Sequence, residues 1–234
     1  QQVNLVVGLS MALTSPLVGL IHWCKKSQPV DTEATIKPEF YDSPEVMILG
    51  FGRFGQATGR ILAANGIPFI ALDKDAEHID FVKQFGNEAY YGEASRLDVL
   101  HAAGIEKVKV VLVATNETKI TENITQLIRQ HFPEIKVIAR ARNRAGYWAL
   151  RSLGAHHVIR ELFKGSVEAA SSTLNALGFS VGEALKKADE FESHDSAMME
   201  YSYEHRDDLD KLIEIGRKGR SDLERLFRQD QIHK

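Results

Sequence analysis

A glycine-rich run near position 50 is the segment whose residue types and spacing most directly suggest chemistry. Residues 50–55 are Gly-Phe-Gly-Arg-Phe-Gly, which matches the pattern G-x-G-x-x-G between an apolar stretch and a helix-favouring stretch. In this context Gly50 allows a tight turn, Gly52 lets a phosphate approach the backbone, and Gly55 lets the helix pack against the strand. The first helical amides would attract the phosphate. The run therefore predicts a nucleotide-binding loop; the alternative is a glycine turn that binds nothing.

An acidic residue follows this loop at the spacing that a nucleotide-binding fold requires. Asp73 lies about 20 residues further along, at the end of a second apolar stretch. A carboxylate in this position can accept hydrogen bonds from ribose hydroxyls. The lack of an arginine directly after Asp73 disfavours a 2′-phosphate, although Lys74 leaves that possibility open. We therefore expect an adenine nucleotide that is bound and not consumed.

Residues that could carry out catalysis are much less evident. His101, His131, His156 and His157 have no carboxylate at a spacing that suggests a catalytic pair, and the sequence contains no HExxH motif. Isolated histidines of this kind are more often ordinary core or surface residues. The single cysteine, Cys24, excludes a disulfide framework and a thiolate metal cluster. We therefore expect a protein that is not an enzyme and has no metal site.

The composition is that of an ordinary folded protein. The chain has 234 residues, with 29 Lys and Arg against 32 Asp and Glu, a net charge of -3 and 44% hydrophobic residues. These values exclude a disordered chain and a protein that binds nucleic acid through bulk positive charge. The length suits one domain of roughly 130 to 150 residues with appendages.

The elements that position the glycine loop alternate between short apolar runs and amphipathic segments. This alternation predicts right-handed crossovers and a Rossmann-like, doubly wound parallel sheet of the α/β class. The predicted strands cover residues 46–49, 68–72, 89–91, 108–114 and 136–139. The predicted helices cover residues 53–65, 76–85, 97–103, 120–131 and 145–153.

The N-terminal segment has a different character from the rest of the chain. No Asp, Glu, Lys or Arg occurs before Lys25, and the apolar run is about as long as a bilayer crossing. Trp23 followed by Lys25 and Lys26 indicates that the chain continues in the cytoplasm. We expect residues 1–26 to be the end of a transmembrane helix; the alternative is a buried helix of a soluble domain.

Three further segments follow this apolar start. Residues 27–44 are polar and hold three of the six prolines, which predicts a linker. Residues 45–160 form the predicted nucleotide-binding domain. Residues 161–234 are charged and helix-favouring, and we expect them to form a helical C-terminal extension.

Several motifs, in order, resemble the KTN/RCK regulatory domains of bacterial potassium transport proteins. They are VMILGFGRFGQATGRIL, ALDKD, YYGEASRLDVLHAAGI, VLVATNE and VIARARN. The combination of GFGRFGQ with HFPEIKVIARAR is similar to the glutathione-gated potassium-efflux systems of the Kef type, and the resemblance covers about residues 45–191. One motif departs from the family, which usually has GDAT where this chain has GEAS at 92–95.

The resemblance implies a sensor in place of a catalyst. It implies the cytosolic regulatory domain of a potassium/proton antiporter at the bacterial inner membrane, forming a homodimer attached to the antiporter domain of the same chain. AMP or NAD(H) would occupy the glycine loop, and glutathione would bind at the dimer interface. Glutathione would hold potassium efflux closed, and bulky glutathione adducts would open it. A flavin-containing quinone reductase-like subunit is an implied ancillary partner, whereas nucleic acid is not a partner.

The resemblance also implies roles for particular residues. The implied cofactor-binding residues are Gly50, Phe51, Gly52, Arg53, Phe54, Gly55, Asp73, Lys74, Glu93, Ala94 and Thr115. The implied glutathione-binding residues are Gln56, Arg60, Asn143, Arg160 and Asp195, and Phe85 would respond to adduct bulk.

The residues themselves allow a partial check of these implied roles. Gln56 and Arg60 are four apart and share one helix face. Arg160, expected beyond the sheet, could hold a carboxylate with two hydrogen bonds. Relatives often carry Asp at position 143 and Asn at position 195. The alternative roles are solvated surface charges for Arg60 and Arg160, and ordinary core burial for Phe85.

Two other classes of function remain open from the sequence. One is the gating domain of a potassium channel or uptake system without glutathione control. The other is a nucleotide-dependent oxidoreductase, which would need catalytic residues that the sequence does not reveal.

Overall fold

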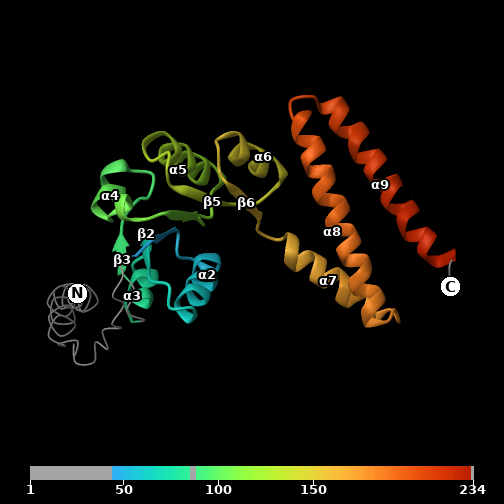
Figure 1. The fold of residues 1–234 in the computed structure, drawn as a ribbon, viewed down its shortest axis with the longest axis horizontal. Coiled ribbons are helices and arrows are strands. Elements are labelled where there is room, and N and C mark those ends of the chain that lie inside the picture. Colours follow the sequence, from blue (N-terminus) through green and yellow to red (C-terminus); the bar gives the residue numbers. More distant parts are fainter. Residues whose placement is uncertain (1–43, 85–87, 233–234) are drawn as a thin grey trace, which may run out of the picture. The chain divides into compact units, whose positions relative to one another are not determined.

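A six-stranded parallel sheet forms the core of the protein. The computed structural model describes residues 44–84 and 88–232 (Figure 1). The strand order is β3-β2-β1-β4-β5-β6, and every neighbouring pair is parallel. The strands are β1 (Val46–Leu49), β2 (Phe69–Asp73), β3 (Glu88–Tyr91), β4 (Val110–Val113), β5 (Lys136–Ala141) and β6 (His157–Arg160). The predicted doubly wound parallel sheet is therefore confirmed.

The strand order reverses at the centre of the sheet. Val46 of β1 pairs with Phe69 of β2 on one side and with Val110 of β4 on the other. The crossovers that leave β1 and β4 therefore run in opposite directions along the sheet. This reversal leaves a crevice at the carboxyl ends of these strands, where open α/β sheets bind ligands.

One expectation about the sheet was wrong. Arg160 was expected beyond the sheet, but the structure places it at the end of a sixth strand, where it pairs with Ala141 of β5. The segment 157–160 has only two aliphatic residues, and its side chains are half-buried or exposed. An edge strand of this kind has a weak apolar signal, because only one neighbour covers it.

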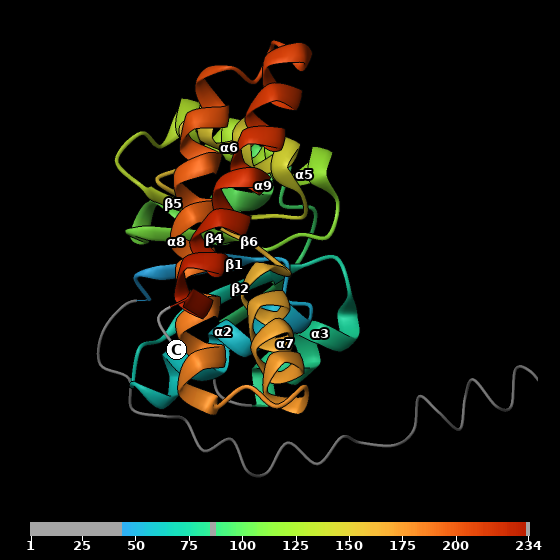
Figure 2. The same ribbon diagram turned by 90° about the vertical axis from the view of Figure 1, so that its right-hand side faces the viewer.

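Helices cover both faces of the sheet. Those of the sheet domain are α2 (Arg53–Ala64), α3 (Ala76–Gln84), α4 (Leu97–Ala102), α5 (Thr118–His131) and α6 (Arg144–Ser152), with a short 3-10 turn η1 (Ile105–Lys107). Helices α2 and α3 lie on one face, and α5 and α6 lie on the other (Figures 1 and 2).

Alternation along the strands explains how both faces are buried. In β1, Ile48 packs in the cluster that includes Phe51 and Ile79, whereas Met47 and Leu49 pack in the cluster on the opposite face. All three β1 side chains are fully buried. A strand that is apolar on both sides is typical of the centre of a parallel sheet.

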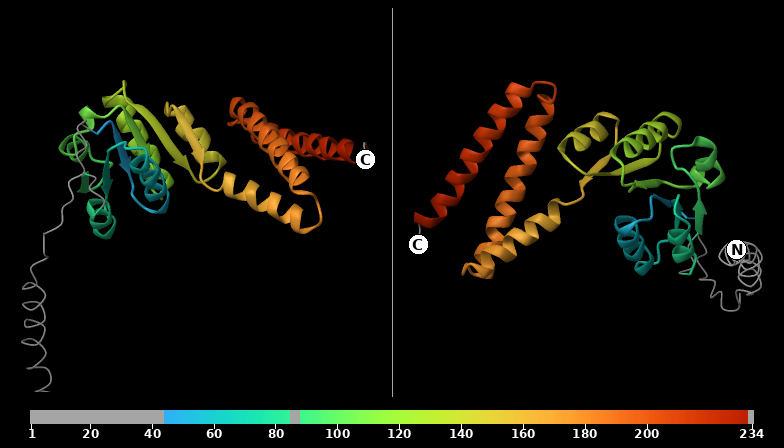
Figure 3. Two further views of the ribbon diagram at one scale, coloured as in Figure 1. Left: turned by 60° about the horizontal axis from the view of Figure 1, so that its bottom comes forward. Right: turned by 180° about the vertical axis from the view of Figure 1, so that it is seen from behind.

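The chain after β6 is helical, as expected. It forms α7 (Phe163–Ala176), α8 (Val181–Glu204) and α9 (Leu209–Ile232), and α8 and α9 run side by side in opposite directions (Figures 1 and 3). A capping box begins α8: the Ser180 hydroxyl accepts a hydrogen bond from Glu183 N, and the Glu183 carboxylate accepts one from Ser180 N. Met199 of α8 and Ile215 of α9 are both buried.

The predicted transmembrane segment 1–26 and most of the linker 27–44 lie outside the described residues. Within 44–84 and 88–232, no helix combines the length and the hydropathy that a membrane crossing needs.

Candidate functional site

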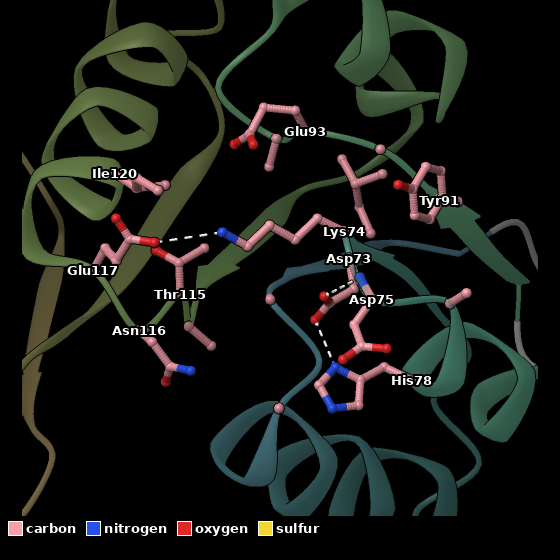
Figure 4. Close-up of a pocket in the computed structure, with 17 residues that line it drawn as sticks. Asp73, Lys74, Asp75, His78, Tyr91, Glu93, Thr115, Asn116, Glu117 and Ile120 are labelled. Atoms are coloured by element: carbon pink, nitrogen blue, oxygen red, sulfur yellow. Dashed lines mark hydrogen bonds and ion pairs between the residues drawn. The ribbon is translucent and has the colours of Figure 1, made fainter.

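A cleft of about 580 Å³ opens at the carboxyl ends of β1 to β4 (Figure 4). It is lined by residues from the ends of β2 and β3, from the loops after the four strands and from the first turns of the following helices. These residues are Gly50, Gly52, Leu72, Asp73, Lys74, Asp75, Ala76, His78, Tyr91, Gly92, Glu93, Ala94, Ala114, Thr115, Asn116, Glu117 and Ile120. Seven of the predicted cofactor residues line it: Gly50, Gly52, Asp73, Lys74, Glu93, Ala94 and Thr115.

The three glycines of the loop have different environments. Gly50 has φ +92°, and a Cβ there would lie 2.9 Å from the Thr115 backbone nitrogen. At Gly55 a Cβ would lie 2.4 Å from the Gly50 carbonyl oxygen, so α2 could not pack as closely on the loop. Gly52 has φ −68°, and a Cβ built there would have no atom within 4 Å. The fold thus requires glycine at positions 50 and 55, whereas Gly52 borders open space beside the cleft.

The amino end of α2 faces this space without a side-chain cap. The N-cap residue is Gly52, which has no side chain that could cap the helix, and the first turn holds no acidic residue. The first amides of a helix lack intrahelical acceptors and carry a partial positive charge. The loop can therefore hold an anion such as a phosphate.

The remaining motif residues do not line the cleft. Phe51 is 3% exposed and stacks on Phe69, with 5.7 Å between the ring centroids. Phe54 is half-buried, and Arg53 is exposed. Their side chains therefore support the loop or face solvent, and Gly55 serves helix packing.

Asp73 ties the second strand to the glycine loop. Its carboxylate accepts hydrogen bonds from the backbone N–H groups of Phe51 and Asp75, the second at 2.9 Å. His78 Nδ1, one turn into α3, lies 3.2 Å from Asp73 Oδ2 (Figure 4). The Asp73 side chain is only 10% exposed. The carboxylate is therefore held rigidly at the position where a ribose would bind.

Other polar side chains that line the cleft also contact neighbouring residues. Lys74 extends across it toward Glu117, the N-cap residue of α5, with 3.4 Å between Nζ and Oε1 (Figure 4). Glu93 accepts a hydrogen bond of 3.1 Å from Ser95. The hydroxyl of Thr115 lies 2.7 Å from that of Thr121 in α5.

Several lining residues were not predicted from the sequence. They include Asp75, His78, Tyr91, Asn116, Glu117 and Ile120. They share one property that the sequence does contain, namely their position at the end of a predicted strand, in the loop after it, or in the next helical turn. Because ligands in open α/β sheets bind beyond the carboxyl ends of the strands, that position was a usable signal.

A buried arginine lies next to this cleft. The side chain of Arg140 in β5 is 5% exposed, and its guanidinium carbon lies 5.5 Å from the centroid of the Phe54 ring. It donates hydrogen bonds to Ala114 O at 3.2 Å and to Asn116 Oδ1 at 2.9 Å, and it pairs with Glu161. Burial lowers the pKa of the Arg140 guanidinium, while the Glu161 carboxylate opposes that shift.

A second polar group lies between β6, α6 and α8. Asp195 of α8, whose side chain is 8% exposed, accepts hydrogen bonds from Arg160 and from Arg144, the latter at 2.8 Å. The Arg160 guanidinium also lies over the Phe163 ring, 3.5 Å from its centroid. The structure thus joins Arg160 and Asp195, and adds Arg144, which the sequence did not point to.

The other predicted glutathione residues are not joined to this group. Asn143 is the N-cap of α6, where its side-chain oxygen accepts a hydrogen bond of 2.8 Å from Gly146 N. Gln56 and Arg60 lie on α2, and neither makes a side-chain hydrogen bond or ion pair with another described residue. Phe85 lies outside the described residues.

These features define a class of protein. A parallel sheet of order 3-2-1-4-5-6, a glycine loop at the switch point and an acidic residue at the end of the second strand define a Rossmann-like nucleotide-binding domain. Two family models match this chain: the TrkA-N domain over residues 46–161, and the potassium efflux system KefB C-terminal domain over residues 165–234.

Sequence similarity to known proteins indicates which family within this class the chain resembles. The chain is 35% identical over 231 residues to the glutathione-regulated potassium-efflux system protein KefC of Cronobacter sakazakii, and 32% identical over 235 residues to KefC of Escherichia coli. These alignments cover 98% and 100% of this chain, and the chain spans 37% of the length of each relative.

A solved structure agrees with the family matches. The Kef CTD of Shewanella denitrificans in AMP bound form superposes with a TM-score of 0.63 at 34% identity, over 68% of this chain and 96% of that one. The chain belongs to the KTN/RCK regulatory domains of the Kef-type glutathione-gated potassium-efflux systems.

Proposed function

We propose that this chain is the cytosolic ligand sensor of a potassium/proton antiporter, with an adenine nucleotide held in the cleft. The observation that carries this proposal is the open space at Gly52, between the uncapped amino end of α2 and the carboxylate of Asp73. A phosphate would meet the α2 amides, and the ribose hydroxyls would meet Asp73. The AMP-bound form of the Shewanella denitrificans relative supports AMP as the first nucleotide to test, with NAD(H) as the second.

The proposed second ligand is glutathione or one of its adducts, at the interface of a homodimer. Glutathione carries two carboxylates and one ammonium. Arg160 and Arg144 can hold a carboxylate, and the buried Asp195 can accept hydrogen bonds from the ammonium. Gln56, which is half-buried, and Arg60, which is exposed, lie one turn apart on α2 and would contact the same peptide across the interface. The names of the KefC relatives support glutathione as the regulator.

In this proposal, ligand chemistry controls the membrane part of the same chain. Glutathione would favour the closed state, and adducts with a bulky group on sulfur would favour the open state. A ligand can shift such an equilibrium only when its affinities for the two states differ. Bulk that meets Phe85 would supply that difference. The sensor would lie on the cytoplasmic face of the bacterial inner membrane, and a flavin-containing quinone reductase-like subunit would be an ancillary partner.

The test of the nucleotide assignment uses two glycines that both have open space where a Cβ would lie. Calorimetric titration of AMP and NADH compares the wild-type chain with Gly52→Val and with Gly165→Val. Both glycines have open space around the missing Cβ, and Gly165 lies far along the chain in α7. We expect Gly52→Val to weaken nucleotide binding by tenfold or more, about 1.4 kcal/mol, while Gly165→Val binds like wild type. Unchanged affinity in Gly52→Val would overturn the assignment.

A further inference from the structure

Arg140 connects the nucleotide cleft to the point where the chain leaves the sheet. One of its terminal nitrogens, Nη2, contacts two acceptors from different parts of the chain. It lies 2.9 Å from Asn116 Oδ1, which lines the cleft, and 3.1 Å from Glu161 Oε2, which follows β6. A single nitrogen thus bridges the cleft and the junction between β6 and α7.

At the cleft, Arg140 makes contacts with more than one residue. Nη1 of Arg140 donates a hydrogen bond to Ala114 O at 3.2 Å. Together with the contact to Asn116, this bond ties the guanidinium to two residues of the loop between β4 and α5. The Phe54 ring in the first turn of α2 covers the same guanidinium. Arg140 therefore contacts both segments that would close on a nucleotide.

At the other end of the bridge, Glu161 is next in the chain to the polar group formed by Arg160 and Asp195. The Glu161 backbone nitrogen donates to Ala141 O at 3.0 Å, which extends the pairing of β5 and β6 by one residue. The preceding residue is Arg160, which pairs with the buried Asp195 of α8. A shift of the Glu161 carboxylate would therefore act on the backbone segment that holds Arg160.

Burial makes the bridge stiff. The Arg140 side chain is 5% exposed, so water cannot readily replace an acceptor that moves away. The guanidinium is also planar, and its donors move together. Its Nε is buried without a hydrogen-bond partner among the described residues, which raises the free energy of the present arrangement. Movement of Asn116 would therefore also change the orientation of the Arg140 guanidinium toward Glu161.

We propose that Arg140 is a positioning residue that transmits nucleotide occupancy from the loop between β4 and α5 to the junction between β6 and α7. The inference rests on the proposed nucleotide function and adds a route by which the cleft influences the group at Arg160 and Asp195. By linkage, a ligand at Arg160 and Asp195 changes nucleotide affinity by the same factor as the nucleotide changes that ligand's affinity.

The test follows backbone amides by hydrogen exchange and mass spectrometry, on the full chain with and without saturating AMP. Two variants act on the bridge at its junction end, away from the lining of the cleft: Glu161→Gln, which removes the charge of the acceptor, and Glu161→Ala, which removes the acceptor itself. The matched control is Glu192→Gln, which removes the same charge from the ion pair with Lys164 between α7 and α8. Circular dichroism establishes that each variant is folded, and either variant of Glu161 decides the test if the other does not fold.

In the wild-type chain and in Glu192→Gln, we expect AMP to slow exchange both in residues 50–56 and in residues 158–166, by threefold or more. In the two bridge variants we expect slower exchange in residues 50–56 alone. If AMP protects residues 50–56 of the wild-type chain and leaves 158–166 unchanged, the transmission is overturned while the nucleotide site stands. Persistent protection of 158–166 in Glu161→Ala also overturns it. Absence of any AMP effect in the wild-type chain overturns the proposed function itself.

Discussion

Arg160 at the end of β6 and Asp195 in the middle of α8 form a largely buried ion pair, with the Arg160 side chain 17% exposed and that of Asp195 8% exposed. This contact fastens α8 to the edge of the sheet. Arg144 of α6 shares the same carboxylate, so one acidic residue serves two guanidinium groups.

The first prediction concerns the stability that this shared carboxylate provides. Asp195→Ala should lower the free energy of unfolding by about 2 kcal/mol, because Arg160 would stay mostly buried without its partner. Arg144 is 60% exposed and should add little. Urea denaturation measures the change. Asp189→Ala, at an exposed position of the same helix, should stay within about 0.5 kcal/mol of wild type. Equal values for the two variants would contradict this account.

The second prediction separates glycines that the fold requires from glycines that it does not. Gly55→Ala should lower the stability by roughly 1–3 kcal/mol, because the new Cβ would lie 2.4 Å from a backbone carbonyl oxygen. Gly165→Ala should raise it by roughly 0.5–1 kcal/mol, since alanine is the better helix former and has open space there. Thermal unfolding of both variants checks the opposite signs. A stabilised Gly55→Ala protein would contradict the packing of α2 on the loop.

The third prediction concerns pH. His156 Nδ1 accepts a hydrogen bond of 3.0 Å from Val137 N, and this bond requires an unprotonated Nδ1. Burial, with help from Arg129 and Lys136, lowers the pKa of His156 below its ordinary value of 6.5. The unfolded chain therefore binds the proton more readily, and stability should fall as the pH drops through 6.5 toward the lower folded-state pKa.

Denaturant titrations between pH 8 and pH 5 measure this dependence. In His156→Asn, an amide oxygen can still accept from Val137 N and does not titrate in this range. The variant should lose part of the decline below pH 6.5. If the wild type and the variant decline in parallel, His156 does not contribute.

The fourth prediction tests the proposed regulation by two ligands of equal charge. Glutathione and a succinimido-glutathione adduct should both lose at least tenfold in affinity in Arg160→Ala, because the carboxylate anchor is common to them. Phe85→Ala should weaken activation by the adduct more than it weakens glutathione binding, since the two ligands differ in bulk at sulfur. Calorimetry gives the affinities, and potassium efflux from cells that carry each variant of the whole transporter gives the activation. Full adduct-triggered efflux in Phe85→Ala would refute the proposed role of the ring.

Much of the fold followed from local patterns in the sequence. The buried β1 is apolar on both sides, and the glycine loop joins it directly to an amphipathic helix, so both were predictable. The edge strand β6 was missed because none of its side chains is fully buried.

The candidate site was predictable only where the contacts are local or follow from the topology. Gly50 and Asp73 belong to one motif, and the structure places both in the cleft. The burial of Arg140 depends on Asn116 and Glu161, which come from other loops, and nothing in its neighbouring sequence marks it. The same is true of Arg144, whose partner lies 51 positions away.

The pairing of β1 with β4 has a consequence for the order in which the protein is made. The flanking residues Glu45 and Lys109 pair across 64 positions, so the two walls of the cleft come from distant parts of the chain. A ribosome would therefore finish the glycine loop well before its opposite wall at Thr115 exists. Contacts of such high sequence separation form late and slowly. A nucleotide that needs both walls can bind only a completed sheet, and binding then stabilises that sheet by mass action. In the proposed function, cellular nucleotide would thus favour chains that have finished folding over partly folded ones.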